Sequence, residues 1–174
     1  MNGEPQPTGL TRSQIETRAA EVLSHHGITS IPVDPVELAN QLGIKVHNAR
    51  FSEPNVSGLI AKRGPVSSLL VENDDSPNRK RFTIAHELGH YFLHLSTDGE
   101  FVDTPVDLQR ASVAPESGSK RVEVEANQFA AALLMPEPKV RQAFSTVRNV
   151  DELARLFRVS REAMAIRIGT LGLA

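Results

Sequence analysis

Apolar side chains near the start of the chain recur every three or four positions, which is the spacing of one face of an amphipathic helix. The stretch Ile15–Leu23 has this spacing, and Gly27 is a typical helix stop. Ser13 and Glu16 form a capping-box pattern, in which serine is followed three residues later by glutamate. The pattern predicts a first helix that begins near Ser13.

The next segment changes from helical periodicity to shorter apolar runs. A short helix is expected first, with Asp34 as its N-cap, Pro35 at its first position and Gly43 just past its end. The runs that follow are separated by turn residues such as proline, asparagine and glycine. They predict a small three-stranded antiparallel sheet formed by residues 44–51, 56–61 and 66–72.

Helical periodicity returns in the second half of the chain. Residues 79–95 and 121–135 each carry an apolar stripe and predict two long helices. Residues 96–119 show no clear element, and we expect them to form a mobile edge of a cleft that admits an extended peptide. Residues 150–173 predict two further helices, with Ser160 as the N-cap of the second, in an arrangement like a helix-turn-helix.

Composition indicates one globular domain with a short addition at each end. The 174 residues are 40% hydrophobic and 23% charged, which is enough for one well-buried core. Residues 1–10 predict a disordered tail, residues 11–145 the main domain, and residues 146–174 a helical extension packed on it. No apolar run approaches the ~20 residues of a membrane span, so we expect a cytoplasmic protein without a membrane partner.

Charge and cysteine content narrow the partners and the ligands. A net charge of −2 gives no overall attraction to nucleic acid. Residues 148–167 hold five arginines against three acidic residues, so DNA contact by the C-terminal helices is not the favoured interpretation. The chain has no cysteine, so any bound metal must use histidine, aspartate or glutamate.

The sequence His86-Glu87-Leu88-Gly89-His90 carries the candidate chemistry. Residues four apart share a helix face, so His86 and His90 can bind one metal ion with Glu87 beside it as a general base. The alternative is a solvated helix face that matches the motif by chance. Catalytic zinc usually has three protein ligands and an open position for water, so a third ligand must come from elsewhere.

The best candidate for that third ligand is Glu123. Glu123 and Asn127 lie four apart at the border of the apolar stripe in 121–135, aimed at whatever the stripe packs against. Asn127 could hydrogen-bond the far nitrogen of a liganding histidine and so set its tautomer. Glu125 projects roughly 200° away from Glu123 and should be solvated, which leaves it as the fallback ligand. The alternative for Glu123 is an exposed helix carboxylate that binds no metal.

Several other residues compete for a place at the site. His94 lies eight residues, or about 12 Å along a helix, beyond His86, too far to share its metal, so we expect a supporting contact from it. Tyr91 could be a hydrogen-bond donor in the cleft, although packing is the simpler role. Acidic residues in the 96–119 segment could also supply an oxygen ligand: Asp98, Asp103 and Asp107.

Taken together, His-Glu-Leu-Gly-His-Tyr-Phe-Leu-His at 86–94 and Glu-Val-Glu-Ala-Asn-Gln-Phe-Ala-Ala-Ala-Leu-Leu-Met-Pro at 123–136 resemble the ImmA/IrrE family of zinc metallopeptidases. The resemblance implies an α+β, mainly helical, zincin-like (gluzincin-like) main domain with one Zn²⁺ per chain. Mn²⁺ is the alternative metal. The resemblance also implies proteolysis of a helix-turn-helix transcriptional repressor, which would release silenced genes.

The expected function is therefore zinc-dependent hydrolysis of a peptide bond in a protein substrate. Zinc would be held by His86, His90 and Glu123, with Glu87 as the base. The alternative is a non-catalytic regulatory module that binds DNA or protein and has a structural or vestigial metal site.

Overall fold

Short polar residues mark the starts of the helices in the computed structural model, which describes residues 6–63, 65–95, 99–103 and 118–174. The Asp34 side chain accepts a backbone hydrogen bond at 2.9 Å and begins α2 (Pro35–Gln41). The Ser160 hydroxyl accepts one at 3.0 Å and begins α7 (Arg161–Thr170). Both predicted N-caps are confirmed.

The capping box of the first helix differs from the predicted one. α1 (Arg12–His25) begins after Thr11, whose hydroxyl accepts from the Gln14 backbone while the Gln14 side chain accepts from the Thr11 backbone. Ser13 and Glu16 lie inside the helix, so assigning the cap to them was wrong. Glutamine serves at the third helical position as well as glutamate does, and the pattern two residues upstream was overlooked.

The sheet has four strands and is mixed, so the predicted three-stranded antiparallel sheet was wrong. Its spatial order is β1-β3-β2-β4, with β1 parallel to β3 and β2 antiparallel to both β3 and β4. Side-chain alternation predicts which face of a strand is buried but not which strand lies beside it. The strands are β1 (Ile44–Ala49), β2 (Gly58–Arg63), β3 (Val66–Glu72) and β4 (Gly99–Asp103). β4 lies within 96–119, where no element was expected.

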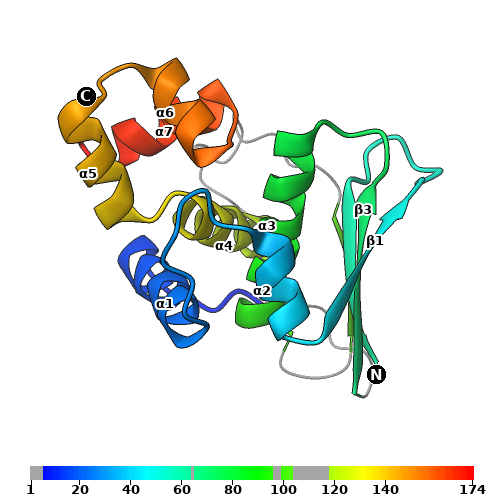
Figure 1. Ribbon diagram of the computed structural model, residues 1–174. Coiled ribbons are helices and arrows are strands. Elements are labelled where there is room, and N and C mark those ends of the chain that lie inside the picture. The colour runs from blue at the N-terminus through cyan, green and yellow to red at the C-terminus, as the bar shows by residue number, and fades with distance from the viewer. Residues whose placement is uncertain (1–5, 64, 96–98, 104–117) are drawn as a thin grey trace.

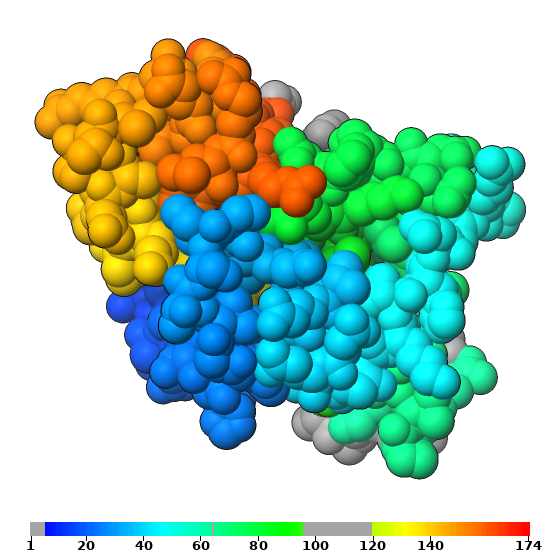
Figure 2. Space-filling model, in the orientation of Figure 1, coloured from blue at the N-terminus to red at the C-terminus, as the bar shows by residue number. Residues whose placement is uncertain are grey.

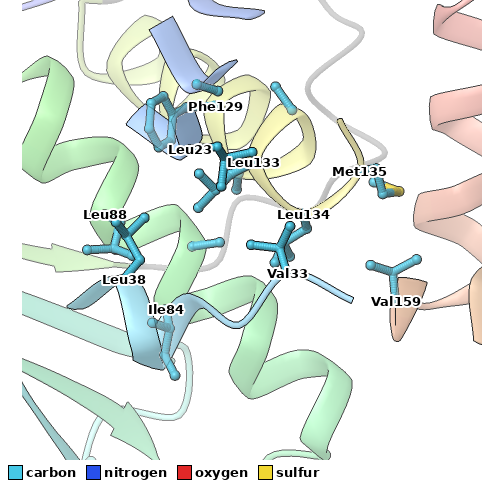
Figure 3. Packing of buried hydrophobic residues seen from close by; sticks show 14 of the residues in the cluster. Leu23, Val33, Leu38, Ile84, Leu88, Phe129, Leu133, Leu134, Met135 and Val159 are labelled. Atoms are coloured by element: carbon cyan, nitrogen blue, oxygen red, sulfur yellow. The ribbon is translucent and has the colours of Figure 1, made fainter. Parts of the chain in front are cut away.

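Two long helices form the centre of the molecule. α3 (Pro77–Leu93) packs on the sheet through β2 and β3, and α4 (Gly118–Leu134) packs against both α3 and α1 (Figure 1). Leu88 of α3 and Leu133 of α4 are fully buried, and they belong to one core with side chains from α1 and α2, such as Leu23 and Leu38 (Figure 3). The fold is therefore α+β and mainly helical, as predicted.

The C-terminal part is three short helices beside the central pair: α5 (Glu137–Thr146), α6 (Val150–Phe157) and α7. They gather on the side of the molecule away from the sheet (Figures 1 and 2). α6 and α7 are joined by three residues and contact each other. The division of the chain at residue 146 stays a prediction. Among the described residues, no helix combines the length and the apolar character that a membrane crossing would need.

Candidate metal centre

α3 places two imidazoles side by side in the interior. His86 and His90 lie one turn apart, and their side chains are 4% and 0% exposed. The two Nε2 atoms are 3.0 Å apart. A pair of buried nitrogens facing each other at this distance is the arrangement expected for two ligands of one cation.

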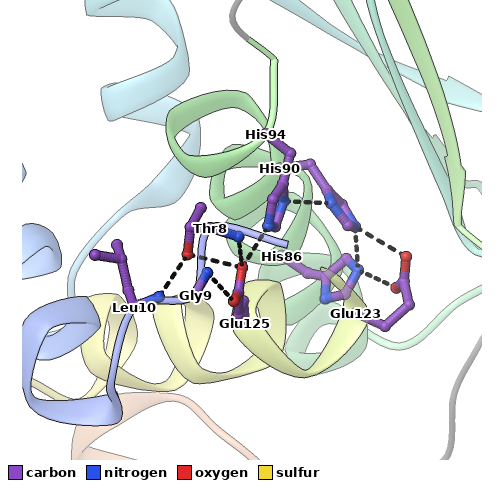
Figure 4. A network of polar contacts seen from close by, with 8 residues as sticks. All are labelled: Thr8, Gly9, Leu10, His86, His90, His94, Glu123 and Glu125. Atoms are coloured by element: carbon purple, nitrogen blue, oxygen red, sulfur yellow. Dashed lines mark hydrogen bonds and ion pairs between the residues drawn. The ribbon is translucent and has the colours of Figure 1, made fainter. Parts of the chain in front are cut away.

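α4 brings a carboxylate to the same point because the two helices approach very closely at Gly89. A Cβ atom on Gly89 would lie 3.0 Å from the Ala126 carbonyl oxygen and 3.1 Å from the Ala126 Cα, so only glycine fits without displacing a backbone. Glu123, one turn before Ala126 on α4, reaches both imidazoles: its Oε2 lies 3.1 Å from His86 Nε2 and its Oε1 3.4 Å from His90 Nε2 (Figure 4).

These three side chains fit a metal ion. A tetrahedral zinc with bonds of ~2.0–2.1 Å separates its ligand atoms by about 3.3 Å. The two Nε2 atoms are 3.0 Å apart, and they lie 3.1 and 3.4 Å from the two different oxygens of Glu123, so all three distances are close to that value. His86, His90 and Glu123 also form a metal-ligand grouping by distance among the described residues. Three ligands would leave one tetrahedral corner open.

The electrostatics suit two neutral nitrogens and one anionic oxygen. Burial lowers the pKa of His90 from 6.5 to about 4, so its imidazole is neutral at pH 7. Burial alone would raise the pKa of Glu123, but the polar influence of the His86 and His90 rings that face its carboxylate outweighs burial and lowers the pKa to about 2. Neutral imidazole and ionised carboxylate are the forms that bind metals.

A second set of contacts lies behind the histidines. Asn127 Oδ1 is 2.8 Å from His86 Nδ1, which places an acceptor on the ring nitrogen that faces away from Glu123. His94, just after α3, has its Nδ1 3.2 Å from His90 Nδ1. The structure thus puts Asn127 and His94 against the outer sides of the two imidazoles and leaves both Nε2 atoms facing Glu123.

Glu125 was expected to be solvated, and that expectation was wrong. The residue is 5% exposed, and its carboxylate accepts hydrogen bonds from the backbone and hydroxyl of Thr8 and from the backbone of Gly9. Periodicity assigned this face of α4 to solvent, but the segment before α1 covers it. Thr8 and Gly9, assigned to a disordered tail, therefore make tertiary contacts. Glu125 faces His94 at 2.9 Å, on the far side from the Nε2 atoms.

Glu87 points toward the sheet. It is 0% exposed, and a Cβ atom on Gly58 of β2 would lie 2.7 Å from its Oε1 and 2.6 Å from Thr83 Cγ2. Gly58 thus makes room for the Glu87 side chain. Gly58 was not among the predicted site residues, although a glycine inside a strand often marks a close approach. Thr8 was not predicted either, because periodicity carries no signal for it.

The remaining candidates lie elsewhere or cannot be placed. Tyr91 is partly buried, packs on the core and meets the Phe92 ring edge-on at 5.4 Å between centroids. Asp98 and Asp107 lie outside the described residues, and of Asp103 only the backbone, in β4, is described. Most of the predicted cleft edge, residues 96–98 and 104–117, lies outside the described residues; β4 and the first residues of α4 form the rest of the 96–119 segment.

The α3–α4 pair gathers two imidazoles and one carboxylate beside a small sheet, a set of side chains that can hold a metal ion. The match to known families is specific. Residues 39–169, three quarters of the chain, match the M78 peptidase family, described as the IrrE N-terminal-like domain. The chain belongs to this metallopeptidase family, as its resemblance to ImmA/IrrE proteins predicted.

Individual relatives agree with this assignment. The radiation response metalloprotease IrrE of Deinococcus radiodurans is 36% identical over 96 residues, which are 53% of this chain and 27% of that protein. The metallopeptidase ImmA of Bacillus subtilis is 22% identical over 167 residues, 95% of this chain and 90% of that protein. This chain thus spans about a quarter of IrrE but most of ImmA.

A solved structure shows that the fold is shared. The chain superposes on a Mycobacterium tuberculosis transcriptional regulator with a TM-score of 0.62 and 20% sequence identity. The match covers 90% of this chain and 46% of the other. At this identity the likeness concerns the fold alone.

Proposed function

We propose that this chain is a zinc-dependent endopeptidase that hydrolyses a peptide bond in a protein substrate. The observation that carries the proposal is the gathering of His86 Nε2, His90 Nε2 and the Glu123 carboxylate at distances of 3.0–3.4 Å, close to the ligand separations of tetrahedral zinc. Membership in a metallopeptidase family supports it independently. In this proposal the three residues are the zinc ligands and Glu87 is the general base.

Each residue has a distinct role in this mechanism. Zinc, when bound, would lower the pKa of water toward 7 and polarise the scissile carbonyl. Glu87, next to the ligand His86 but outside the ligand group, accepts the water proton and passes it to the leaving amine. Glu123 contributes one negative charge, and Asn127 orients the His86 ring by accepting from its Nδ1.

We infer that the substrate is a helix-turn-helix transcriptional repressor in the cytoplasm, whose cleavage relieves repression. The support is the family: the resemblance to ImmA/IrrE proteins implies this substrate class, and one relative is named for a radiation response. The C-terminal helices α6 and α7 would then pack on the peptidase domain without contacting DNA, consistent with their weak charge excess.

Glu87→Gln tests the catalytic proposal. The zinc-loaded protein would be incubated with candidate helix-turn-helix repressors from the same genome, with and without a chelator. We expect the variant to retain one zinc and to lose cleavage by roughly 10²–10⁴-fold, the usual contribution of a general base. Glu21→Gln, at an exposed position on α1, is the matched control and should cleave normally. Substantial cleavage by Glu87→Gln would refute the assigned base.

The same experiment separates the enzyme from a regulatory module. A module with a structural metal would bind zinc through four protein ligands and would leave the repressor intact in every sample. Loss of zinc in His86→Gln together with intact repressor in all wild-type reactions would favour that alternative. Cleavage that requires both zinc and Glu87 would exclude it.

A further inference from the structure

A chain of polar contacts runs from the segment before α1 to the candidate metal centre. The Glu125 carboxylate accepts from Thr8 N and Thr8 Oγ1, both at 2.9 Å, and from Gly9 N at 3.2 Å. The same carboxylate lies 2.9 Å from His94 Nε2, and His94 Nδ1 lies 3.2 Å from His90 Nδ1. Figure 4 shows these links leading to His90. The His94 side chain is 0% exposed and that of Glu125 is 6% exposed.

The donor and acceptor roles along this chain follow from its two ends. An ionised carboxylate only accepts, so neutral His94 must donate its Nε2 proton to Glu125. His94 Nδ1 is then an acceptor, and His90 must donate its own Nδ1 proton to it. Only one lone pair remains on the His90 ring, at Nε2, and that atom faces His86 and Glu123.

We propose that His94, Glu125 and the Thr8–Gly9 segment act as a positioning relay that holds His90 in its metal-binding tautomer and ring orientation. This inference rests on the proposed metal site. It assigns the N-terminal segment a part in metal retention, although that segment is more than a hundred residues from Glu125 in sequence. The two histidines are supported differently: His86 by one amide of α4, and His90 by a relay that ends on the segment before α1.

The length of the relay gives it a distinct consequence. A partner that hydrogen-bonds a liganding histidine typically contributes 10–100-fold to metal affinity. Glu125 is anchored by three donors from two residues, so loosening the N-terminal segment should weaken zinc binding without touching any ligand. If Glu125 served only to fix the segment to α4, changes at Thr8 would affect stability and leave zinc affinity unchanged.

Zinc affinity of the full chain, measured by competition with a chelator and Zn²⁺ alone, tests the relay. For His94→Phe we expect a loss of roughly 10–100-fold. His94→Gln, which keeps an acceptor and a donor, should recover part of it. Thr8→Val removes one of the three donors to Glu125 and should cost less than about tenfold. Thr17→Val is the matched control, because the exposed Thr17 hydroxyl bonds only within α1, and its zinc affinity should equal the wild type.

A spectroscopic measurement distinguishes positioning from simple packing. In ¹H–¹⁵N spectra of the zinc-loaded protein, His94 should carry its proton on Nε2 and His90 on Nδ1. A His94 ring protonated on Nδ1 alone would overturn the relay.

Failure of the relay and failure of the metal site give different results. If His86→Gln and His90→Gln lose zinc while folded His94→Phe and Thr8→Val bind it as tightly as the wild type, the relay is wrong and the metal site stands. If His90→Gln binds zinc normally, the metal site is wrong and the relay falls with it.

Discussion

At the scale of single residues, adding one methyl group at Gly58 should lower catalytic turnover more than it lowers zinc affinity. A Cβ atom there would lie 2.6 Å from Thr83 Cγ2 and 2.7 Å from Glu87 Oε1, so both side chains would have to move. Gly58→Ala should therefore displace the proposed base while His86, His90 and Glu123 keep their places. We expect a stability loss of about 1–3 kcal/mol from overpacking and a larger relative loss of turnover than of zinc affinity.

Gly169→Ala is the control for that substitution. Gly169 lies in α7, and nothing lies within 4 Å of a Cβ atom built on it. Alanine should raise stability there by up to about 1 kcal/mol through helix propensity and leave turnover unchanged. Normal turnover in Gly58→Ala would show that the Glu87 carboxylate is not confined by β2.

The lowered pKa of His90 predicts that the metal-free protein becomes less stable to unfolding in acid. Its pKa is about 4 in the fold against a usual 6.5, so on acidification the unfolded chain takes up the proton first. The contribution of His90 to the free energy of unfolding is therefore fully present above pH 6.5 and is lost as the pH drops toward 4. The difference between the two pKa values corresponds to roughly 3 kcal/mol of this free energy. Glu123, whose pKa is lowered to about 2 from 4.5, adds to the loss only below pH 4.5.

Urea denaturation in the presence of a chelator at pH 7.5, 6 and 5 measures this effect. His90→Leu, which cannot titrate, should show a shallower loss between pH 7.5 and 5 than the wild type. His47 is exposed on β1, and His47→Asn should keep the wild-type slope. Equal slopes in all three proteins would contradict the assignment of the acid sensitivity to His90.

At the scale of elements, the crossing of α3 and α4 sets the distances at the candidate site. Gly89→Ala would bring a methyl group within 3.0–3.1 Å of the Ala126 backbone, and a helix backbone cannot rotate away as a side chain can. The helices must separate by a few tenths of an ångström, which moves Glu123 relative to both histidines. We expect weaker zinc binding and a net destabilisation of about 1–3 kcal/mol, despite alanine's better helix propensity.

Zinc titration and thermal unfolding with and without zinc check the Gly89→Ala prediction. The variant should lose part of the stabilisation that zinc provides to the wild type, because that stabilisation depends on affinity. Gly169→Ala again serves as the control. If Gly89→Ala is as stable as the wild type and binds zinc as tightly, then α3 and α4 can accommodate a methyl group where they cross.

Hydrophobic periodicity predicted the helices and strands better than it predicted which of them pack side by side. The stripes of α3 and α4 indicated that His86, His90 and Glu123 would face the same interface, because side-chain direction on a helix follows from spacing. The parallel pairing of β1 with β3, the strand β4 and the burial of Glu125 could not be predicted in this way. Each depends on which segment lies alongside, and contacts distant in sequence leave no local pattern.

At the scale of the whole molecule, the two ends of the chain are joined by a buried ion pair. Arg167 of α7 bonds both carboxylate oxygens of Glu16 on α1, and its Nε donates to the Met135 carbonyl oxygen at 3.0 Å. The Arg167 and Glu16 side chains are 3% and 20% exposed. The C-terminal helices are thus held to the first helix across 151 residues of sequence.

Arg167→Met tests whether this pair couples the C-terminal helices to the rest of the fold. The change leaves a largely buried Glu16 carboxylate and the Met135 carbonyl without the guanidinium, and losing one partner of a buried pair costs about 3–5 kcal/mol. Arg18→Met breaks an exposed pair with Glu21 and should cost at most about 1 kcal/mol. Urea denaturation followed by circular dichroism compares the two. If the pair is a structural tie, Arg167→Met should lower the midpoint far more than Arg18→Met and separate the unfolding of α5–α7 from that of the α3–α4 pair. Equal midpoints would mean that apolar packing alone holds the C-terminal helices in place.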